Sequence, residues 1–162
     1  MATLNELIEK VAKIEVAVEN ALENEGADAV RQAVIDAAKK YVYDAYPDPM
    51  FHSRRYGNGG ILDPHSVVIE VHGTELIAKD DPDWQQLWGG SGTGTGSWRP
   101  AKRLSEAIAS GDRRYNMHNA GPRPFHEHAK EEVIASGALE EALRRGLARQ
   151  GFDASDATFR FT

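Results

Sequence analysis

An N-terminal capping box and the apolar stripe after it commit the start of this chain to a helix. Thr3 and Glu6 have the T-x-x-E spacing in which hydroxyl and carboxylate satisfy otherwise unpaired amide donors. Apolar residues then recur at three- and four-residue intervals on one helical face: Leu4, Leu7, Ile8, Val11, Ile14, Val18, Ala21 and Leu22. This stripe is typical of a helix that packs within its own protein. A second interpretation is a helix that packs on a partner subunit.

A second, alanine-rich stripe comes next and ends before two prolines. Its members are Val30, Ala33, Val34, Ala37, Ala38, Tyr41 and Ala45. Gly26 interrupts the pattern between the stripes, and Asp28 can cap the second helical segment. The segments form either a helical hairpin or one long helix weakened at Gly26, and we favour the break. Pro47 and Pro49 end the helical region, since proline lacks an amide donor.

The middle of the chain contains one predicted β-hairpin. Residues 66–71 (SVVIEV) and 75–78 (ELIA) are rich in β-branched and aliphatic side chains, and Gly73 lies in the short connection between them. Two strands alone are marginally stable in water. The hairpin is therefore expected to lie against the helices or to join strands of another subunit.

A long C-terminal helix is predicted from Pro124, a good first-turn residue, to a glycine cap at Gly151. Pro124 and Phe125 are expected to anchor it, and Ser136 with Gly137 marks a point of kinking. The tail, residues 152–162, either adds an edge strand or trails as a mobile end. With a short helix at residues 104–112, the prediction is an α+β fold: N-terminal helices, a small antiparallel hairpin, a short helix and a long C-terminal helix, in a single domain over residues 1–162.

Two loop segments are the candidate protein interfaces. Residues 80–100 form a glycine-rich loop that carries all three tryptophans, Trp84, Trp88 and Trp98. Long loops of this kind are usually functional or disordered. These indoles either clamp the loop onto its own domain or contact an assembly partner, and the third alternative is an ordinary disordered loop. Residues 50–60 add Arg54, Arg55 and Tyr56, which form either a solvated loop or a polar contact patch.

Composition excludes several classes of protein. The formal charge is −6, and no cationic cluster is present to displace counterions from phosphates, so nucleic-acid binding is disfavoured. With no cysteine, disulfides and thiol chemistry are absent, which fits a reducing compartment. No apolar run resembles a signal peptide or a membrane span, so we expect synthesis in the cytoplasm and no membrane partner.

Motifs for catalysis or cofactor binding are incomplete. The glycine run at residues 90–96 lacks the Lys-Ser/Thr of a phosphate loop. His126 and His128 are two residues apart, so on a helix they point in different directions and would not share a metal ion. The aspartates at residues 80–83 depart from the calcium-binding pattern, and the serines and histidines at residues 52–66 lack a nucleophile elbow. We expect no catalytic residues, no cofactor and no metal.

The order of the short helix at residues 104–112 (LSEAIASGD) and the segment Arg123, Pro124 and Phe125 resembles a family of small tail-component proteins of tailed bacteriophages, often called tail-completion or neck proteins. The resemblance implies a virion structural protein at the head–tail junction or the top of the tail. It further implies a homo-oligomeric ring, a hexamer in the family, whose partners are other neck or head-completion proteins and the tail tube protein.

Two alternatives belong to other functional classes. One is a small metal-dependent hydrolytic enzyme that uses the histidine-rich residues 118–131, and stoichiometric zinc would identify it. The other is a cytosolic adaptor that binds a peptide through the tryptophan loop, which predicts a monomer with a saturable partner.

Overall fold

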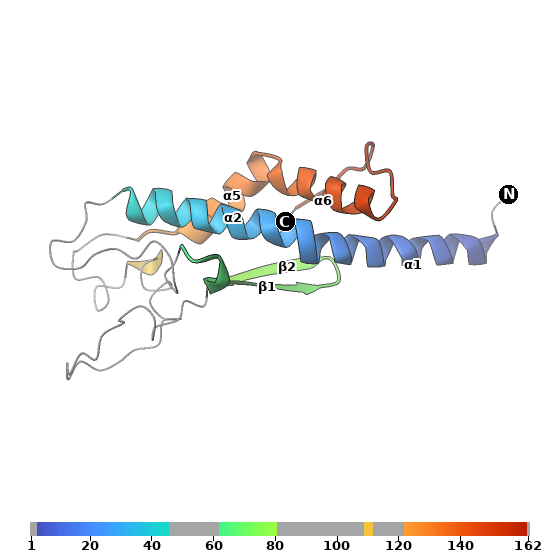
Figure 1. Cartoon of the computed structure of the whole chain (residues 1–162), viewed down its shortest axis with the longest axis horizontal. Coiled ribbons are helices and arrows are strands. Elements are labelled where there is room, and N and C mark those ends of the chain that lie inside the picture. The colour runs from blue at the N-terminus through green and yellow to red at the C-terminus, as the bar shows by residue number, and fades with distance from the viewer. Residues whose placement is uncertain (1–2, 46–61, 81–108, 112–121, 162) are drawn as a thin grey trace, which may run out of the picture.

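The computed structural model describes residues 3–45, 62–80, 109–111 and 122–161. In these ranges a long N-terminal helix lies between a two-stranded antiparallel sheet and two C-terminal helices (Figure 1). The fold is α+β, which confirms the predicted class.

The N-terminal helix is continuous, so the break predicted at Gly26 is wrong. Helix α1 (Leu4–Ala21) passes through a wide π-helical turn, η1 (Leu22–Gly26), into α2 (Ala27–Ala38), and a second wide turn, η2 (Lys39–Tyr43), comes after it. Gly26 keeps right-handed helical angles, φ −65° and ψ −45°. Asp28 therefore lies inside a helix, where it forms an ion pair with Arg31 at 2.7 Å instead of capping a new helix.

The packing around Gly26 tolerates a glycine but does not require one, because an added Cβ would meet its neighbours at ordinary contact distances. Gly26 is buried, and a Cβ added there would lie 3.5 Å from Leu143 Cδ2 and 3.4 Å from the Ala21 carbonyl oxygen. A glycine in a helix interior costs about 1 kcal/mol relative to alanine, which weakens the helix without ending it. Contacts on both sides of η1 hold the backbone helical there.

The hairpin has the predicted position and connection. Strands β1 (Val67–His72) and β2 (Glu75–Asp80) pair antiparallel, with Val67 opposite Asp80 and His72 opposite Glu75. Gly73 adopts φ +62° in the connection, a conformation that glycine takes without steric cost. Alternate residues of the hairpin, Ile69 and Val71 among them, face the helices and pack against the core.

The long C-terminal helix predicted from Pro124 to Gly151 is divided. Helix α5 (Phe125–Ala135) is capped by Ser136, and α6 (Ala138–Arg149) begins after Gly137, whose φ of +73° takes the chain out of the helical region. The kink considered at this point is a full break. Gly151 caps α6 as predicted, with φ +85° and its amide donating to the Ala148 carbonyl at 3.0 Å.

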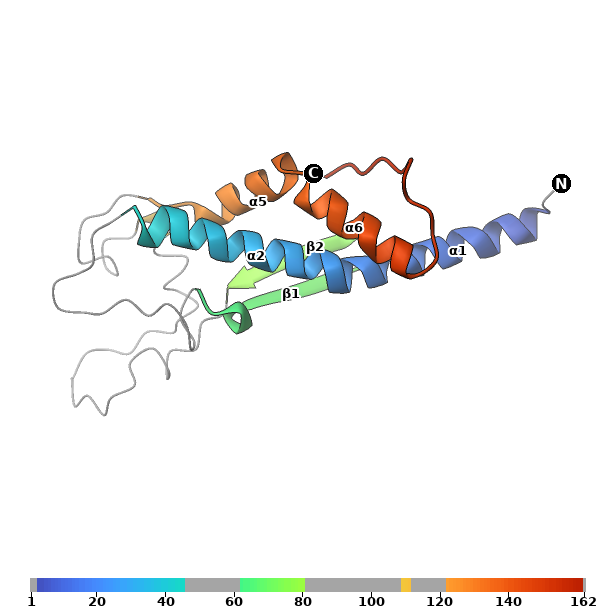
Figure 2. The same cartoon turned by 45° about the horizontal axis from the view of Figure 1, so that its top comes forward.

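The core consists of two adjoining apolar clusters around the long helix. Figures 1 and 2 show α5 and α6 along one side of this helix and the hairpin along another. The first cluster joins α2, α5 and β1 and contains Val34, Ala37, Ala38, Val42, Leu62, Val67, Phe125 and Ala129. The second joins the end of α1 to α6 and the tail and contains Ala17, Ala21, Leu22, Val133, Leu139, Leu143, Leu147 and Ala154.

The C-terminal tail is fixed to α6 by one arginine. Arg144 donates to the carbonyl oxygens of Ser155 and Ala157, each at 2.7 Å, and also to that of Ala154. Its guanidinium lies 5.6 Å from the centre of the Phe159 ring. Residues 152–161 form no strand, so over this range the tail is a clamped irregular segment and not the edge strand considered from its alternating pattern.

Candidate functional site

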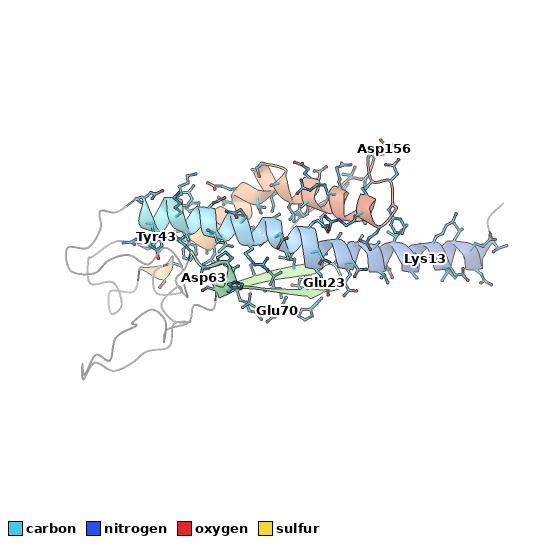
Figure 3. The ribbon with its side chains drawn as sticks, viewed as in Figure 1. Lys13, Glu23, Tyr43, Asp63, Glu70 and Asp156 are labelled. Carbon is cyan, nitrogen blue, oxygen red and sulfur yellow. The ribbon has the colours of Figure 1, made fainter. Side chains whose placement is uncertain are left out.

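The N-terminal part of α1 projects beyond the rest of the described fold. In Figures 1 and 2 it extends past the ends of α6 and of the hairpin. Every side chain of residues 4–16 is exposed, and burial begins at Ala17. At 1.5 Å per residue this segment is roughly 20 Å long. Lys13, labelled in Figure 3, lies on it with no other described element alongside.

The projecting segment carries an uncovered apolar face. The side chains of Leu4, Leu7, Ile8, Val11 and Ile14 are between 47% and 73% exposed. An amphipathic helix normally buries such a stripe against another element, and large contiguous apolar patches on soluble proteins mark interaction sites. We call this set the α1 face.

Packing within the protein therefore explains only the C-terminal part of the predicted stripe. Ala21 and Leu22 of the stripe are buried against α6 and the tail, in agreement with the first interpretation, and Ala17 beside them, which the stripe did not include, is buried too. For residues 4–16 that interpretation is wrong within the described structure. The periodicity shows which side of a helix is apolar, and it does not show what covers that side.

Local interactions hold both ends of the segment. At its start the capping box is complete, with the Thr3 amide donating to Glu6 Oε2 at 2.6 Å and the Glu6 amide donating to Thr3 Oγ1 at 3.3 Å. At its base, Gln150, which follows α6 as its C-terminal cap, donates to the Ala17 carbonyl at 2.8 Å. On another side of the helix, the Gly73 amide of the hairpin donates to Glu19 Oε1 at 3.3 Å. The segment thus leaves the body of the protein in a defined direction.

A polar cluster joins α5 to the end of the long helix and is the other candidate site. Glu132 Oε1 accepts from Lys40 Nζ at 2.6 Å and from the Tyr41 hydroxyl at 2.7 Å. The hydrogen bond from Lys40, followed by that from Tyr41, holds the pKa of Glu132 below its ordinary value, and the same bond to Glu132 raises the pKa of Lys40. Both groups are held in the charged form found at neutral pH, which suits a structural link between helices.

The rings of the histidines near this cluster contact aromatic side chains of the fold. His126 and His128 both lie on α5, and the His128 ring stacks on Tyr41 with centroids 4.1 Å apart. Within the described ranges, no group of three or more metal-ligating side chains is gathered to hold an ion. His118, part of the histidine-rich segment, lies outside those ranges.

The residues predicted as an interface cannot be compared with the α1 face. Trp84, Trp88, Trp98, Arg54, Arg55 and Tyr56 all lie outside the described residues, so their role stays a prediction. Of the two expected anchors, Phe125 is fully buried at the start of α5, and Pro124 immediately precedes that helix. None of the helices in the described part of the chain is long and apolar enough to cross a membrane.

Comparison with known proteins gives one match. The model of the YomN family, a phage-derived protein family, matches residues 3–149. This range includes the α1 face and every described helix and strand. No curated protein and no solved structure matches the chain.

Proposed function

Because this chain belongs to the phage-derived YomN family, we propose that it is a virion structural protein at the head–tail junction or the top of the tail. Its role there is mechanical and needs no substrate. The chain completes or joins the tail by fitting its surfaces against copies of itself and against neighbouring virion proteins. It is made in the host cytoplasm and resides in the neck or tail of the virion.

The α1 face is the observation that supports this proposal. A subunit that works alone gains nothing from a projecting helix with its apolar stripe in water, whereas an assembly subunit buries that stripe when it meets its neighbour. Burial of a large aliphatic side chain contributes roughly 1.5–3 kcal/mol when it is complete. The residues of the α1 face are about half exposed or more, so together they supply a substantial driving force for association.

A closed ring is the assembly that we propose, with six copies as the family resemblance implies. Rings form when one face of a subunit contacts a different face of the next copy. Further partners are other neck or head-completion proteins and the tail tube protein, which meet surfaces left open by the ring. The tryptophan loop at residues 80–100 remains a proposed second contact.

Neither alternative gains specific support from the described residues. The enzyme based on residues 118–131 would use His128, but this ring is stacked on Tyr41, 3.8 Å from Glu131 at its Nδ1 atom. The peptide-binding adaptor depends on tryptophans outside the described ranges. Native mass spectrometry separates the three, since a metal-free ring, a zinc-bound monomer and a metal-free monomer with a saturable partner have different masses.

The direct test of the proposed function uses the phage that encodes the chain. Its gene is inactivated, and the lysate is examined by electron microscopy and by mass spectrometry of purified particles. We expect the protein in wild-type particles at a few copies each, and separate heads and tails in the mutant, with joining restored by the gene in trans. Normal infectious particles from the mutant, and absence of the protein from wild-type particles, would overturn the proposal.

A further inference from the structure

The uncovered stripe of α1 has the spacing of a coiled-coil seam. Leu4, Leu7, Val11 and Ile14 alternate steps of three and four residues, which is the a and d pattern of a heptad repeat. Val18 and Ala21 continue the same spacing toward the body of the protein. A seam with a 3.5-residue period fits along another helix of the same kind.

The protein already covers the far end of this seam with elements of its own. Ala21 is completely buried against α6, and Val18 packs on the second cluster. Leu143 and Leu147 of α6 are part of that cover. Beyond Ala17 toward the N-terminus no described element continues it, so the remaining seam is open to a helix from outside.

Charges beside the seam select the partner and its direction. Lys10 precedes Val11 at a g position, and Glu15 follows Ile14 at an e position, so the two flank the seam on opposite sides. In a parallel pair of identical helices, a g residue faces the e residue five positions later on the partner. Lys10 of each copy then meets Glu15 of the other, and two opposite-charge pairs form. An antiparallel pair instead brings the two Lys10 side chains to the same side.

We propose that the α1 face pairs in parallel with the α1 face of a second copy of this chain. The inference rests on the proposed function in that it names one contact of the assembly: α1 joins two copies through the same face, and the contacts between unlike faces that close the ring lie elsewhere on the subunit. Self-complementary charge and a continuous apolar seam are what a homotypic coiled coil needs. A lipid surface fits less well, because interfacial helices carry a Lys/Arg-rich polar face. Here the polar face mixes Glu6, Glu9 and Lys13.

Two valines on the same helix provide a matched test. Val11 lies in the seam and Val16 lies about 140° away from it around the helix. Their exposed fractions in the protein are nearly equal, 55% and 58%. Val11→Gln and Val16→Gln remove the same atoms, add the same amide and favour the helix to the same degree.

Sedimentation velocity on the full chain, over a range of concentrations, measures the effect. Val11→Gln is expected to weaken self-association at least tenfold, and Val16→Gln is expected to leave it unchanged. Both variants keep the wild-type thermal melting of the protomer, because neither side chain is buried in it. Equal weakening by the two variants, or a wild-type chain that stays monomeric at all concentrations, would overturn the proposal.

Charge reversal tests the flanking pairs separately from the seam. Lys10→Glu or Glu15→Lys alone places like charges together twice in each parallel pair, and roughly tenfold weaker association is expected at low salt. The double reversal restores opposite charges and is expected to recover the wild-type affinity. Failure of the double variant to recover affinity would exclude the Lys10–Glu15 contact.

The absence of native cysteine makes the direction measurable by cross-linking. In a parallel pair Leu4→Cys faces its own copy, within the separation that a disulfide spans, whereas in an antiparallel pair it lies far from its equivalent. Under mild oxidation we expect a covalent dimer from Leu4→Cys and none from Glu9→Cys on the polar side. An associating Leu4→Cys chain that does not cross-link would refute the parallel arrangement.

These outcomes are independent of those for the proposed function. A purified chain that pairs through α1 but is absent from virions would refute the virion role and leave the pairing intact. A protein that is present in virions but whose association ignores Val11, Lys10 and Glu15 would refute the pairing and leave the virion role intact.

Discussion

Gly146→Ala is expected to destabilise the protein although it replaces glycine by a better helix former. Gly146 lies in α6 where that helix crosses α1. A Cβ added there would stand 2.7 Å from the Ala21 Cβ, 3.0 Å from the Ala21 Cα and 2.7 Å from Glu25 Oε2. Carbon atoms in contact are normally about 3.5–4.0 Å apart, so the helices must separate by about 1 Å.

The magnitude is set by two opposing effects. Alanine favours a helix interior by about 1 kcal/mol relative to glycine. Overpacking a well-filled core costs about 1–3 kcal/mol, and here the obstacle includes the backbone of α1, which cannot rotate away. The Glu25 carboxylate can move, but it forms an ion pair with Arg149 at 2.6 Å. We therefore expect a net loss of about 1–2 kcal/mol in the free energy of unfolding.

Urea unfolding followed by circular dichroism measures this loss. Ala148→Gly, at an exposed position of the same helix, is the control that reports helix propensity alone and is expected to cost about 1 kcal/mol. Ala21→Gly removes one obstacle, so the double variant should lose less stability than the sum of the two single changes. A Gly146→Ala protein more stable than wild type by about 1 kcal/mol, the full gain in helix propensity, would show that α6 and α1 are not in close contact.

Three further changes have defined outcomes. Phe125→Ala empties a fully buried site and should lower the free energy of unfolding by about 3–5 kcal/mol, measured by the same urea titration; a loss under about 1 kcal/mol would contradict the burial. The pKa of Glu132 is depressed below its ordinary value of 4.5, chiefly by the hydrogen bond from Lys40. The stabilising effect of the Glu132 carboxylate is therefore present above pH 4.5 and lost as the pH falls below it. Glu132→Gln should flatten the pH dependence of the free energy of unfolding in that acidic range. An unchanged pH dependence there would count against a stabilising Lys40–Glu132 interaction. Arg144→Ala removes the donor to three tail carbonyl groups, so limited proteolysis should cut residues 152–161 faster at neutral pH; equal cleavage rates would mean that the tail is held by its phenylalanines alone.

The sequence predicted the elements better than their junctions. Apolar spacing located the buried face of α2, and β-branched residues with Gly73 located the hairpin, because these signals are local. Two glycines that interrupt helical patterns adopt different backbone conformations, and the spacing of apolar residues around them does not predict which. Gly26 stays helical between packed turns, whereas Gly137 takes φ +73° and separates α5 from α6. The difference comes from the tertiary contacts on each side.

The candidate site shows the same limit. The α1 stripe was visible in the sequence, and so was the alternative of packing on a partner subunit. Its exposure was not visible, because that depends on where α6 and the hairpin end in space. The buried part at Ala21 and Leu22 and the exposed part at Leu7 and Val11 belong to one uninterrupted periodic pattern.

The wide turn at Leu22–Gly26 connects two parts of one long helix that have different surroundings. Helix α1 has an exposed N-terminal part, and helix α2 packs in the core. Each residue of an α-helix advances the chain by about 100° around its axis, and a π-helical turn holds one residue more than an α-helical turn. Loss or gain of a single residue there would rotate α1 by about 100° relative to α2 and take Ala17 and Ala21 out of their packing against α6. The length of this turn therefore fixes the one rotation of α1 that buries Ala17 and Ala21 while the α1 face stays uncovered, so the direction in which that face points is tied to the core itself.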